Sequence, residues 1–236
     1  MIKAVIFDFD GVILESADIK TEAFRELFSK YPEKIEKIVE YHLLNAGISR
    51  YVKFRYFYEN ILGRSLSKEK ELKLGDAFSK IVLEKVLSAP FVKGALEFLT
   101  EPNFCYNFFI ASGTPEEELH SILRERNIDK CFKEAHGSPK TKPDVITDIL
   151  NRYNLANNEA VYVGDAESDR RAAEESKVFF VERKADLENR IEEYDDCFKI
   201  KDLSNLRETL EKINPPSPLL QRGEKKGRSG QRVRKK

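Results

Sequence analysis

The sequence is poor in cysteine, in long apolar runs and in net charge, and each shortage excludes a class of protein. Its 236 residues include only three cysteines, at positions 105, 131 and 197, and no two of them form a Cys-x-x-Cys pair. This wide spacing argues against a disulfide framework and against a zinc site, and it favours buried thiols in a reducing cytosol. We therefore expect a cytoplasmic protein.

Long apolar segments are also missing. No part of the chain approaches the roughly 18 consecutive apolar residues of a membrane-spanning helix. The N-terminus runs directly into a predicted strand, without the charged region and long apolar run of a signal peptide. We expect no signal peptide and no membrane partner.

The formal net charge is zero, but the charges are unevenly distributed. Residues 214–236 contain eight Lys or Arg and one Glu, so about +7 lies in this tail and about −7 on the rest. An acidic folded part argues against nucleic acid as a partner. The tail is rich in Pro, Gly, Arg and Lys, so we expect it to be disordered. A functionally idle extension is favoured over weak nucleic-acid or surface binding.

The hydrophobic pattern predicts an α/β fold. A buried strand over 2–8 is followed by apolar residues at helical spacing over 17–88. From Pro90 and Gly94 onward, predicted strands (107–111, 132–135, 160–163, 178–181) alternate with predicted helices (115–127, 143–153, 169–176). Such alternation implies a doubly wound parallel sheet with helices on both faces. We expect a core formed by residues 1–16 and 88–213, with a helical insert, 17–87, after the first strand.

The first strand ends in two carboxylates, Asp8 and Asp10, followed at once by Gly11. Because side chains alternate along a strand, the two acids should lie on the same side. Two close carboxylates repel each other unless a divalent cation neutralises one of them, or unless they divide a nucleophilic and an acid/base role. Short Asp-x-Asp motifs recur by chance, so the pair alone fits an acidic turn equally well.

Polar residues also follow three later strands. Ser112-Gly113-Thr114 suits a phosphate oxygen, although a plain helix N-cap is the simpler interpretation of these residues alone. Asp165 follows another strand, and Asp169 lies in the next helix, where it also fits a cap. Lys140 and Lys142 lie in a loop before a helix, where lysines are usually solvated.

The conjunction of these clusters is more informative than any one of them. They follow successive strand ends, which is where open α/β sheets form their sites. A nucleophile, a second carboxylate, a hydroxyl, a lysine and two further acids are together what phosphoryl transfer with one Mg²⁺ requires. The sequence therefore predicts a phosphoryl-transfer site.

In the order and spacing of these clusters, the chain resembles the haloacid dehalogenase-like (HAD) superfamily over about residues 1–210. The resemblance is carried by Asp8-Phe9-Asp10-Gly11-Val12, Ser112, Lys140 and Gly164-Asp165 with Asp169. The helical insert looks like the small cap of the branch that contains phosphoglycolate phosphatases and β-phosphoglucomutases. The resemblance implies a Rossmann-like core with an α-helical cap.

The resemblance also implies a role for each matched residue. Asp8 would be the nucleophile that forms an aspartyl phosphate, and Asp10 the general acid and then the general base. Asp8, the backbone carbonyl of Asp10, and Asp165 would bind Mg²⁺, with Asp169 as a further ligand or behind the ligands. Ser112 and the N–H of Gly113 would hold the phosphoryl oxygens.

The family's lysine has two candidates in this chain. Lys140 is favoured because it lies four residues before Asp144, as the lysine does in the family's Lys-Pro-x-Pro-Asp pattern. The prolines of that pattern are not kept here, so Lys142 stays the alternative.

Asp10 indicates which type of bond is cleaved, and the cap indicates which groups the substrate carries. Dehalogenases and phosphonatases of the superfamily lack a carboxylate at the position of Asp10, so hydrolysis of a phosphate monoester fits best. The turn Gly47-Ile48-Ser49-Arg50 resembles one that binds a distal phosphate in β-phosphoglucomutases, and Arg50 suits a second anionic group. His42, Arg50 and Lys53 form a basic cluster that fits a substrate site and an ordinary solvated helix face equally well.

These expectations combine into a functional prediction. We expect an Mg²⁺-dependent phosphatase, monomeric or homodimeric, for a small phosphorylated metabolite such as phosphoglycolate or a sugar phosphate. The alternative is a phosphomutase, which is weakened because Lys20 stands where the mutase has a histidine in its first cap helix. A non-catalytic binding protein is less favoured, because all six site residues are present.

Overall fold

The computed structural model describes residues 1–101, 106–186, 192–194 and 197–213. The tail, 214–236, and Cys105 therefore lie outside the described residues. Cys131 and Cys197 are free thiols that are partly exposed, whereas the sequence predicts buried ones.

The described strands form a single mixed sheet. The strands are β1 (Ala4–Phe7), β2 (Asn107–Pro115), β3 (Glu134–Ser138), β4 (Ala160–Gly164), β5 (Phe179–Arg183), β6 (Glu192–Tyr194) and β7 (Cys197–Ile200). Their order across the sheet is β3-β2-β1-β4-β5-β7-β6. Neighbouring strands are parallel except at the edge, where β6 runs antiparallel to β7. This order confirms the predicted α/β fold.

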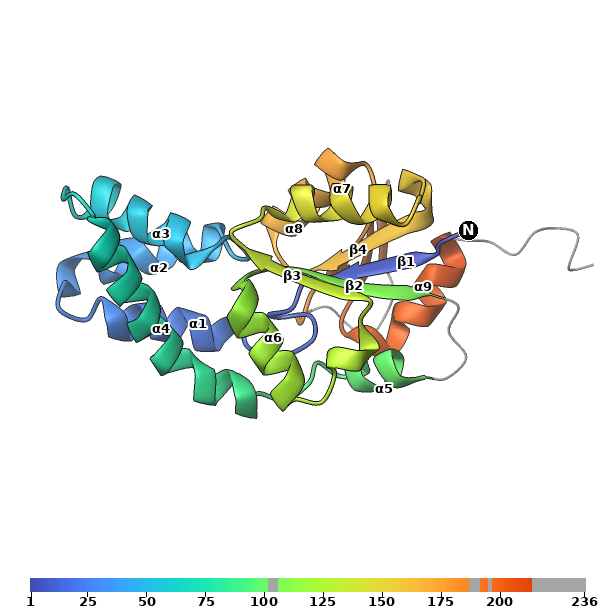
Figure 1. Ribbon diagram of the computed structural model, residues 1–236, viewed down its shortest axis with the longest axis horizontal. Coiled ribbons are helices and arrows are strands. Elements are labelled where there is room, and N and C mark those ends of the chain that lie inside the picture. The colour runs from blue at the N-terminus through green and yellow to red at the C-terminus, as the bar shows by residue number, and fades with distance from the viewer. Residues whose placement is uncertain (102–105, 187–191, 195–196, 214–236) are drawn as a thin grey trace, which may run out of the picture.

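Helices cover both faces of this sheet (Figure 1). One face is covered by α5 (Ala95–Thr100), α6 (Glu116–Glu125) and α9 (Leu206–Ile213), and the other by α7 (Lys142–Arg152) and α8 (Glu167–Ser176). In the central strand β1, Val5 and Phe7 pack toward the first group, and Ala4 and Ile6 pack toward the second. All four side chains are fully buried, which explains why the strand reads as a continuous apolar run.

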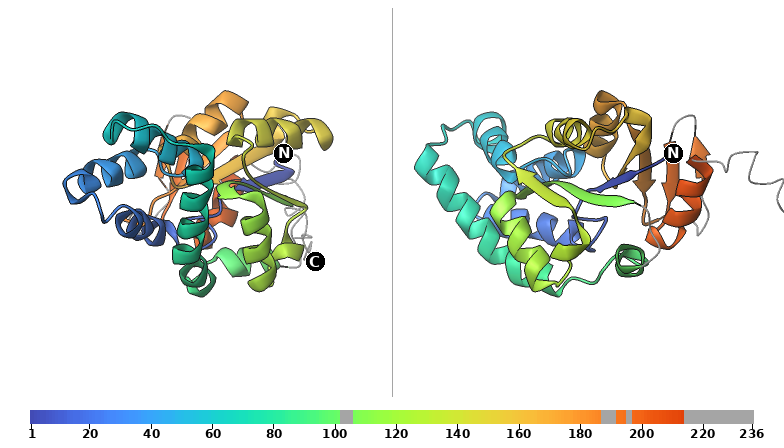
Figure 2. Two further views of the ribbon diagram at one scale, coloured as in Figure 1. Left: turned by 60° about the vertical axis from the view of Figure 1, so that its left-hand side comes forward. Right: turned by 45° about the vertical axis from the view of Figure 1, so that its right-hand side comes forward.

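Four further helices gather beyond the carboxyl ends of the strands (Figures 1 and 2). They are α1 (Ala17–Leu27), α2 (Ile35–Leu44), α3 (Arg50–Tyr56) and α4 (Lys68–Ser88), and we call them the cap helices. Their shared core is aromatic. The ring of Phe24 lies 4.6–6.0 Å, centroid to centroid, from the rings of Phe54, Phe57 and Phe78.

The chain reaches and leaves the cap helices through two adjacent segments. Leu14 forms an isolated antiparallel bridge with Phe91, and the N–H of Glu15 donates to the carbonyl of Pro90 at 2.9 Å. Arg183 on β5 binds Glu15 with a shortest distance of 2.6 Å. The cap helices are thus joined to the sheet by a paired connection that is anchored to the core.

Two details differ from the prediction. Strand β2 extends to Pro115, so Ser112-Gly113-Thr114 lies within the strand, and its register with β3 is irregular there. Helices α5 and α9 and strands β6 and β7 are not predicted, because elements of three to eight residues are too short to show a clear hydrophobic repeat.

Candidate active site

The turn after β1 places Asp8 at the centre of the sheet edge. The N–H of Asp8 donates to the carbonyl of Val163 at 2.9 Å, which extends the pairing with β4 by one residue. The buried carboxylate accepts a hydrogen bond from the N–H of Phe9 at 2.7 Å. Gly11 has a φ of +75°, and a Cβ there would lie 2.1 Å from a carboxylate oxygen of Asp165. Only glycine lets the turn close against the end of β4.

Three carboxylates meet at this point. Oxygen atoms of Asp8, Asp165 and Asp169 all lie within 4.8 Å of one another. Burial raises the pKa of Asp8 to about 7, since the attraction of Lys142 does not fully offset it and Asp169 adds to it. Burial and the neighbouring Asp8 also raise the pKa of Asp165 well above its usual range. Without a cation, this cluster resists full ionisation.

The three acids of this cluster differ in how many hydrogen bonds their carboxylate oxygens already accept, and Asp169 accepts the most. One oxygen of Asp169 accepts from Lys142 at 2.5 Å and from the hydroxyl of Tyr162 at 2.9 Å. The other accepts the N–H groups of Asp165 and Ala166 at 3.3 and 3.1 Å. Asp169 therefore caps α8 and orients Lys142, which favours a place behind the metal ligands.

Asp8 and Asp165 have more capacity left for a metal. Within the described part of the chain, no hydrogen bond reaches the carboxylate of Asp165. The cluster sets the buried carboxylates of Asp8 and Asp169 and the partly exposed one of Asp165 against one lysine, and leaves an excess of negative charge on hard oxygen ligands. That donor set fits Mg²⁺.

The structure places Lys142, and not the favoured Lys140, against this cluster. The nitrogen of Lys142 lies 2.9 Å from Asp8 and 2.5 Å from Asp169, and its side chain is 7% exposed. The side chain of Lys140 is 49% exposed, and its nitrogen lies 3.3 Å from Asp148, away from the cluster. Burial opposes the charge of Lys142, but Asp169 and Asp8 outweigh it and raise its pKa.

The start of α7 explains this correction. The side chain of Thr141 accepts the N–H of Asp144 at 3.3 Å, so Thr141 is the N-cap and Lys142 is the first helical residue. The buried lysine is the one that begins the helix directly after the cap, Lys142. The distance in sequence from a lysine to Asp144 does not identify it.

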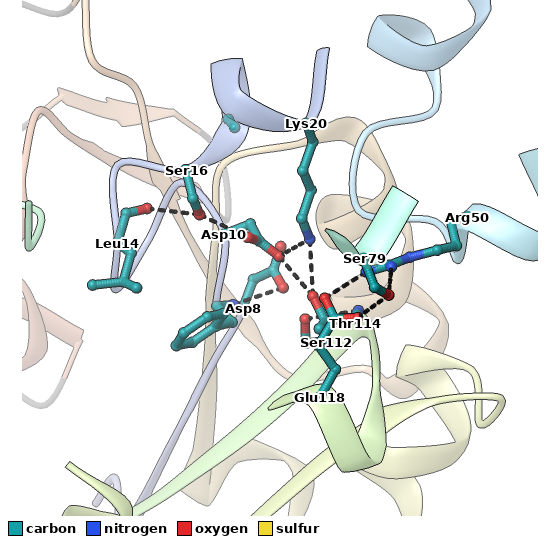
Figure 3. Close-up of polar contacts among 12 residues, drawn as sticks. Asp8, Asp10, Leu14, Ser16, Lys20, Arg50, Ser79, Ser112, Thr114 and Glu118 are labelled. Carbon is teal, nitrogen blue, oxygen red and sulfur yellow. Dashed lines mark hydrogen bonds and ion pairs between the residues drawn. The ribbon is translucent and has the colours of Figure 1, made fainter. Parts of the chain in front are cut away.

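Asp10 lies beside Asp8 and has its own set of partners (Figure 3). It accepts hydrogen bonds from the hydroxyl of Ser16 at 2.6 Å and of Thr114 at 2.9 Å, and it forms an ion pair with Lys20 of α1. The ammonium of Lys20 also donates to Thr114 at 2.9 Å. Burial opposes ionisation of Asp10, but Lys20 and these hydrogen bonds outweigh it and lower its pKa.

The sequence assigned Ser16 no role at the site, and it placed Thr114 in a polar cluster without predicting its contact with Asp10. Thr114 belongs to the polar cluster at the end of β2, so its position was indicated but its partner was not. The contact between Lys20 and Asp10 joins residues ten apart, and only the fold of the turn after β1 reveals it.

The turn between α2 and α3 closes over the end of β2. Ser112 is buried, and its hydroxyl accepts the N–H of Thr114 at 3.1 Å. A Cβ on Gly113 would lie 2.4 Å from the carbonyl oxygen of Gly47. A Cβ on Gly47 itself, which has a φ of +76°, would lie 2.6 Å from the nitrogen of Lys142. The Gly47 turn therefore lies directly over the lysine and the expected phosphate cradle.

A cavity of about 90 Å³ lies between this sheet edge and the cap helices. The core contributes Asp8, Asp10 and Asp165 to its lining, together with Gly113. The cap helices contribute both polar and aromatic side chains, among them Lys20, Thr21, Phe24, His42, Arg50, Lys53 and Phe78. It is far smaller than the roughly 300 Å³ of a typical ligand pocket, so it suits a small substrate.

Arg50 lines this cavity, but its charge is already paired. Its guanidinium donates to Glu118 of α6 at 2.7 Å and to Ser79 of α4 at 2.8 Å, and Ser79 also donates to Glu118. Arg50 is 4% exposed and stacks over the ring of Phe78. It therefore fastens the cap helices to α6, rather than presenting a free cation to a second anionic group.

His42 and Lys53 are also buried, at 5% and 3% exposure. This excludes the alternative of a solvated helix face for the basic cluster. The two side chains hydrogen-bond to each other at 2.8 Å.

Comparisons with known proteins agree with this geometry. The family model described as "Haloacid dehalogenase-like hydrolase" matches residues 5–182. A phosphorylated carbohydrates phosphatase of Thermotoga maritima is 22% identical over 181 residues, which cover 75% of this chain and 82% of that protein.

Solved structures share the fold. A β-phosphoglucomutase from Clostridium difficile matches with a TM-score of 0.69 and 18% identity, over 91% of this chain and 98% of its own. A predicted phosphoglycolate phosphatase from Haemophilus somnus matches with a TM-score of 0.67 and 15% identity, over 89% and 98%. In the described ranges, no helix combines the length and apolar character needed to cross a membrane.

Proposed function

The chain belongs to the haloacid dehalogenase-like hydrolase family, and we propose that it is an Mg²⁺-dependent phosphatase that hydrolyses a small phosphate monoester through an aspartyl phosphate. The observation that carries the proposal is the position of Asp8. Its carboxylate lines the cavity between the sheet edge and the cap helices, in contact with Lys142 and within reach of a carboxylate of Asp165. Asp10 lines the same cavity.

Each residue then has a defined part in the reaction. A carboxylate oxygen of Asp8 attacks phosphorus, and the bond from phosphorus to the ester oxygen breaks. Asp10 donates a proton to that leaving oxygen, then removes a proton from the water that releases phosphate from Asp8. Lys142 offsets the negative charge of Asp8 and of the transferred group. Ser112 and Gly113 hold phosphoryl oxygens at the end of β2.

Asp8, Asp165 and the backbone carbonyl of Asp10 would hold the metal, and Asp169 would orient Lys142 behind them. When bound, Mg²⁺ would neutralise these carboxylates and favour the ionised form of Asp8.

The cap helices, as a domain of residues 17–87, would select the substrate. The small cavity and the name of the Thermotoga maritima relative support a small phosphorylated metabolite, such as phosphoglycolate or a sugar phosphate. Lys20, which is paired with Asp10, stands where the mutase has a histidine. This difference supports transfer of the phosphoryl group to water rather than to a second hydroxyl of the substrate.

A phosphate-release assay on a panel of phosphorylated metabolites tests the proposal. We expect release with Mg²⁺, loss of release with EDTA, and recovery when Mg²⁺ is added back. Asp8→Asn should abolish turnover. Activity at the wild-type rate in that variant, or metal-independent hydrolysis, would refute the mechanism. Isomerisation of a sugar phosphate without phosphate release would instead identify a mutase.

A further inference from the structure

Lys53 differs from the other cations of the cavity in having no anionic partner. Three basic side chains of the cap helices line the cavity: Lys20, Arg50 and Lys53. Lys20 is paired with Asp10, and Arg50 with Glu118. Among the described residues, no carboxylate oxygen lies within 4 Å of the nitrogen of Lys53.

Within the described residues, the ammonium of Lys53 makes one hydrogen bond, and this bond fixes its direction. Its nitrogen lies 2.8 Å from Nδ1 of His42, and Nε2 of His42 lies 3.1 Å from the hydroxyl of Thr21. Since an ammonium only donates, Nδ1 accepts and Nε2 carries the ring proton that Thr21 accepts. Burial and the charge of Lys53 lower the pKa of His42 to about 3, which keeps this ring neutral. His42 therefore holds one proton of Lys53 and leaves two for another acceptor.

Apart from His42, the surroundings of Lys53 do little to stabilise its positive charge. Its side chain is buried, and its nitrogen lies 5.7 Å from the centroid of the Phe24 ring. Burial, with the charges of Lys20 and Lys142, lowers the pKa of Lys53 to about 7. A buried ammonium is unfavourable unless an anion meets it, and the cavity is where such an anion can arrive.

Asp8, Asp10 and Asp165 line the cavity from the side of the sheet. The fourth acid of its lining, the exposed Asp18, belongs to α1, whereas Lys53 belongs to α3. An ester phosphate bound at Asp8 and Ser112 would therefore leave the remainder of the substrate facing Lys53. The cavity has a volume of about 90 Å³, so a remainder of a few atoms suits it.

We propose that Lys53, oriented by His42, binds a carboxylate of the substrate, so that the preferred substrates are short phosphorylated carboxylic acids rather than phosphorylated alcohols of the same length. This inference rests on the proposed phosphatase function and assigns to Lys53 the role that the sequence suggested for Arg50. Lys53 is a residue that determines specificity, and His42 is a positioning residue.

Steady-state kinetics with two matched substrates tests the role of Lys53. Phosphoglycolate and 2-hydroxyethyl phosphate differ only in a carboxylate against a hydroxymethyl group. Lys53→Met should raise the KM for phosphoglycolate about 10- to 100-fold, as expected for loss of a charge-assisted hydrogen bond, and leave that for hydroxyethyl phosphate within about 2-fold. Lys53→Arg should restore part of the preference. Lys80→Met, at an exposed lysine of α4, is the matched control and should change neither KM.

His42→Leu should raise the KM for phosphoglycolate by a smaller factor than Lys53→Met and should lower the ratio of kcat/KM for phosphoglycolate to that for hydroxyethyl phosphate, whereas Lys80→Met should leave this ratio unchanged. An equal effect of Lys53→Met on both substrates, or a wild-type protein without preference, would overturn the inference.

A binding measurement separates this inference from the phosphatase proposal. Titration calorimetry of phosphoglycolate with Mg²⁺ into the Asp8→Asn variant needs no turnover. Adding Lys53→Met should weaken binding about 10-fold or more, whereas adding Lys80→Met should not. If the wild type releases no phosphate from any ester but this difference in binding persists, the phosphatase proposal fails and the carboxylate site stands. If phosphate is released but Lys53→Met and Lys80→Met bind phosphoglycolate equally well, the phosphatase proposal stands and the carboxylate site fails.

Discussion

Replacing Asp8 by Asn should stabilise the metal-free protein at neutral pH while removing its activity. Burial and the neighbouring acids raise the pKa of Asp8 from an ordinary 3.8 to about 7. These values differ by about 3, and a difference of one corresponds to about 1.4 kcal/mol. Ionising Asp8 in the folded protein therefore costs about 4 kcal/mol once the pH exceeds 7.

The sign follows from proton linkage. Between pH 4 and 7 the folded state keeps on Asp8 a proton that the unfolded state has lost, so the free energy of unfolding falls as the pH rises. Asn does not titrate, so the free energy of unfolding of Asp8→Asn lacks this decrease with pH. The stability difference in favour of Asp8→Asn should grow by about 2–3 kcal/mol between pH 5 and pH 7.5. The attraction of Lys142 is already contained in the pKa of Asp8, and Lys142 itself stays charged at both pH values, so it adds no further pH dependence.

The assay is urea unfolding followed by circular dichroism, in EDTA, at these two pH values. Asp10→Asn is the matched control, because Lys20 and the hydrogen bonds lower the pKa of Asp10. Its ionised form stabilises the fold, so Asp10→Asn should be less stable than the wild type at pH 7.5, and the gap should close as the pH falls toward 3. A stability difference for Asp8→Asn that does not change with pH, or that favours the wild type more at pH 7.5, would refute the reasoning.

Three further predictions concern the lysines and the tail. Lys142→Met should lower kcat by at least about 10²-fold, because the charge beside Asp8 is lost, whereas Lys140→Met should keep nearly full activity in the same assay. Lys20→Met should raise the pKa of Asp10, so the alkaline limb of the profile of kcat/KM against pH, where Asp10 loses the proton that it donates to the leaving oxygen, should move to higher pH; an unmoved limb would contradict the role of this ion pair. A chain shortened to residues 1–214 should keep its unfolding midpoint and its kcat, and a large loss of either would show that the basic tail is needed.

The sequence predicts the parts of the site that lie next to buried strands. β1 and β4 are buried on both faces, so their apolar runs are easy to recognise. Asp8 and Asp165 each follow the last residue of such a strand directly, so locating the strand also locates the carboxylate.

The remaining parts depend on contacts that spacing does not encode. The cap at Thr141 makes Lys142 the first residue of α7, but the burial of Lys142 against Asp8 and Asp169 follows only from the way that α7 packs on the sheet. The partner of Arg50 is Glu118, 68 residues further along the chain, and it becomes apparent only when α3 packs near α6.

The paired connection between Leu14–Glu15 and Pro90–Phe91 also bears on engineering. Because the chain departs and returns at neighbouring points, the cap helices form a cassette whose two ends are already joined across the host. Replacing such an insert changes the closure entropy only slowly with its length, so the core should tolerate exchange for another cap or for a short loop. A version with a short loop in place of the cap helices would let bulky phosphorylated molecules reach Asp8, and it would lose the contacts by which the cap helices select a small substrate.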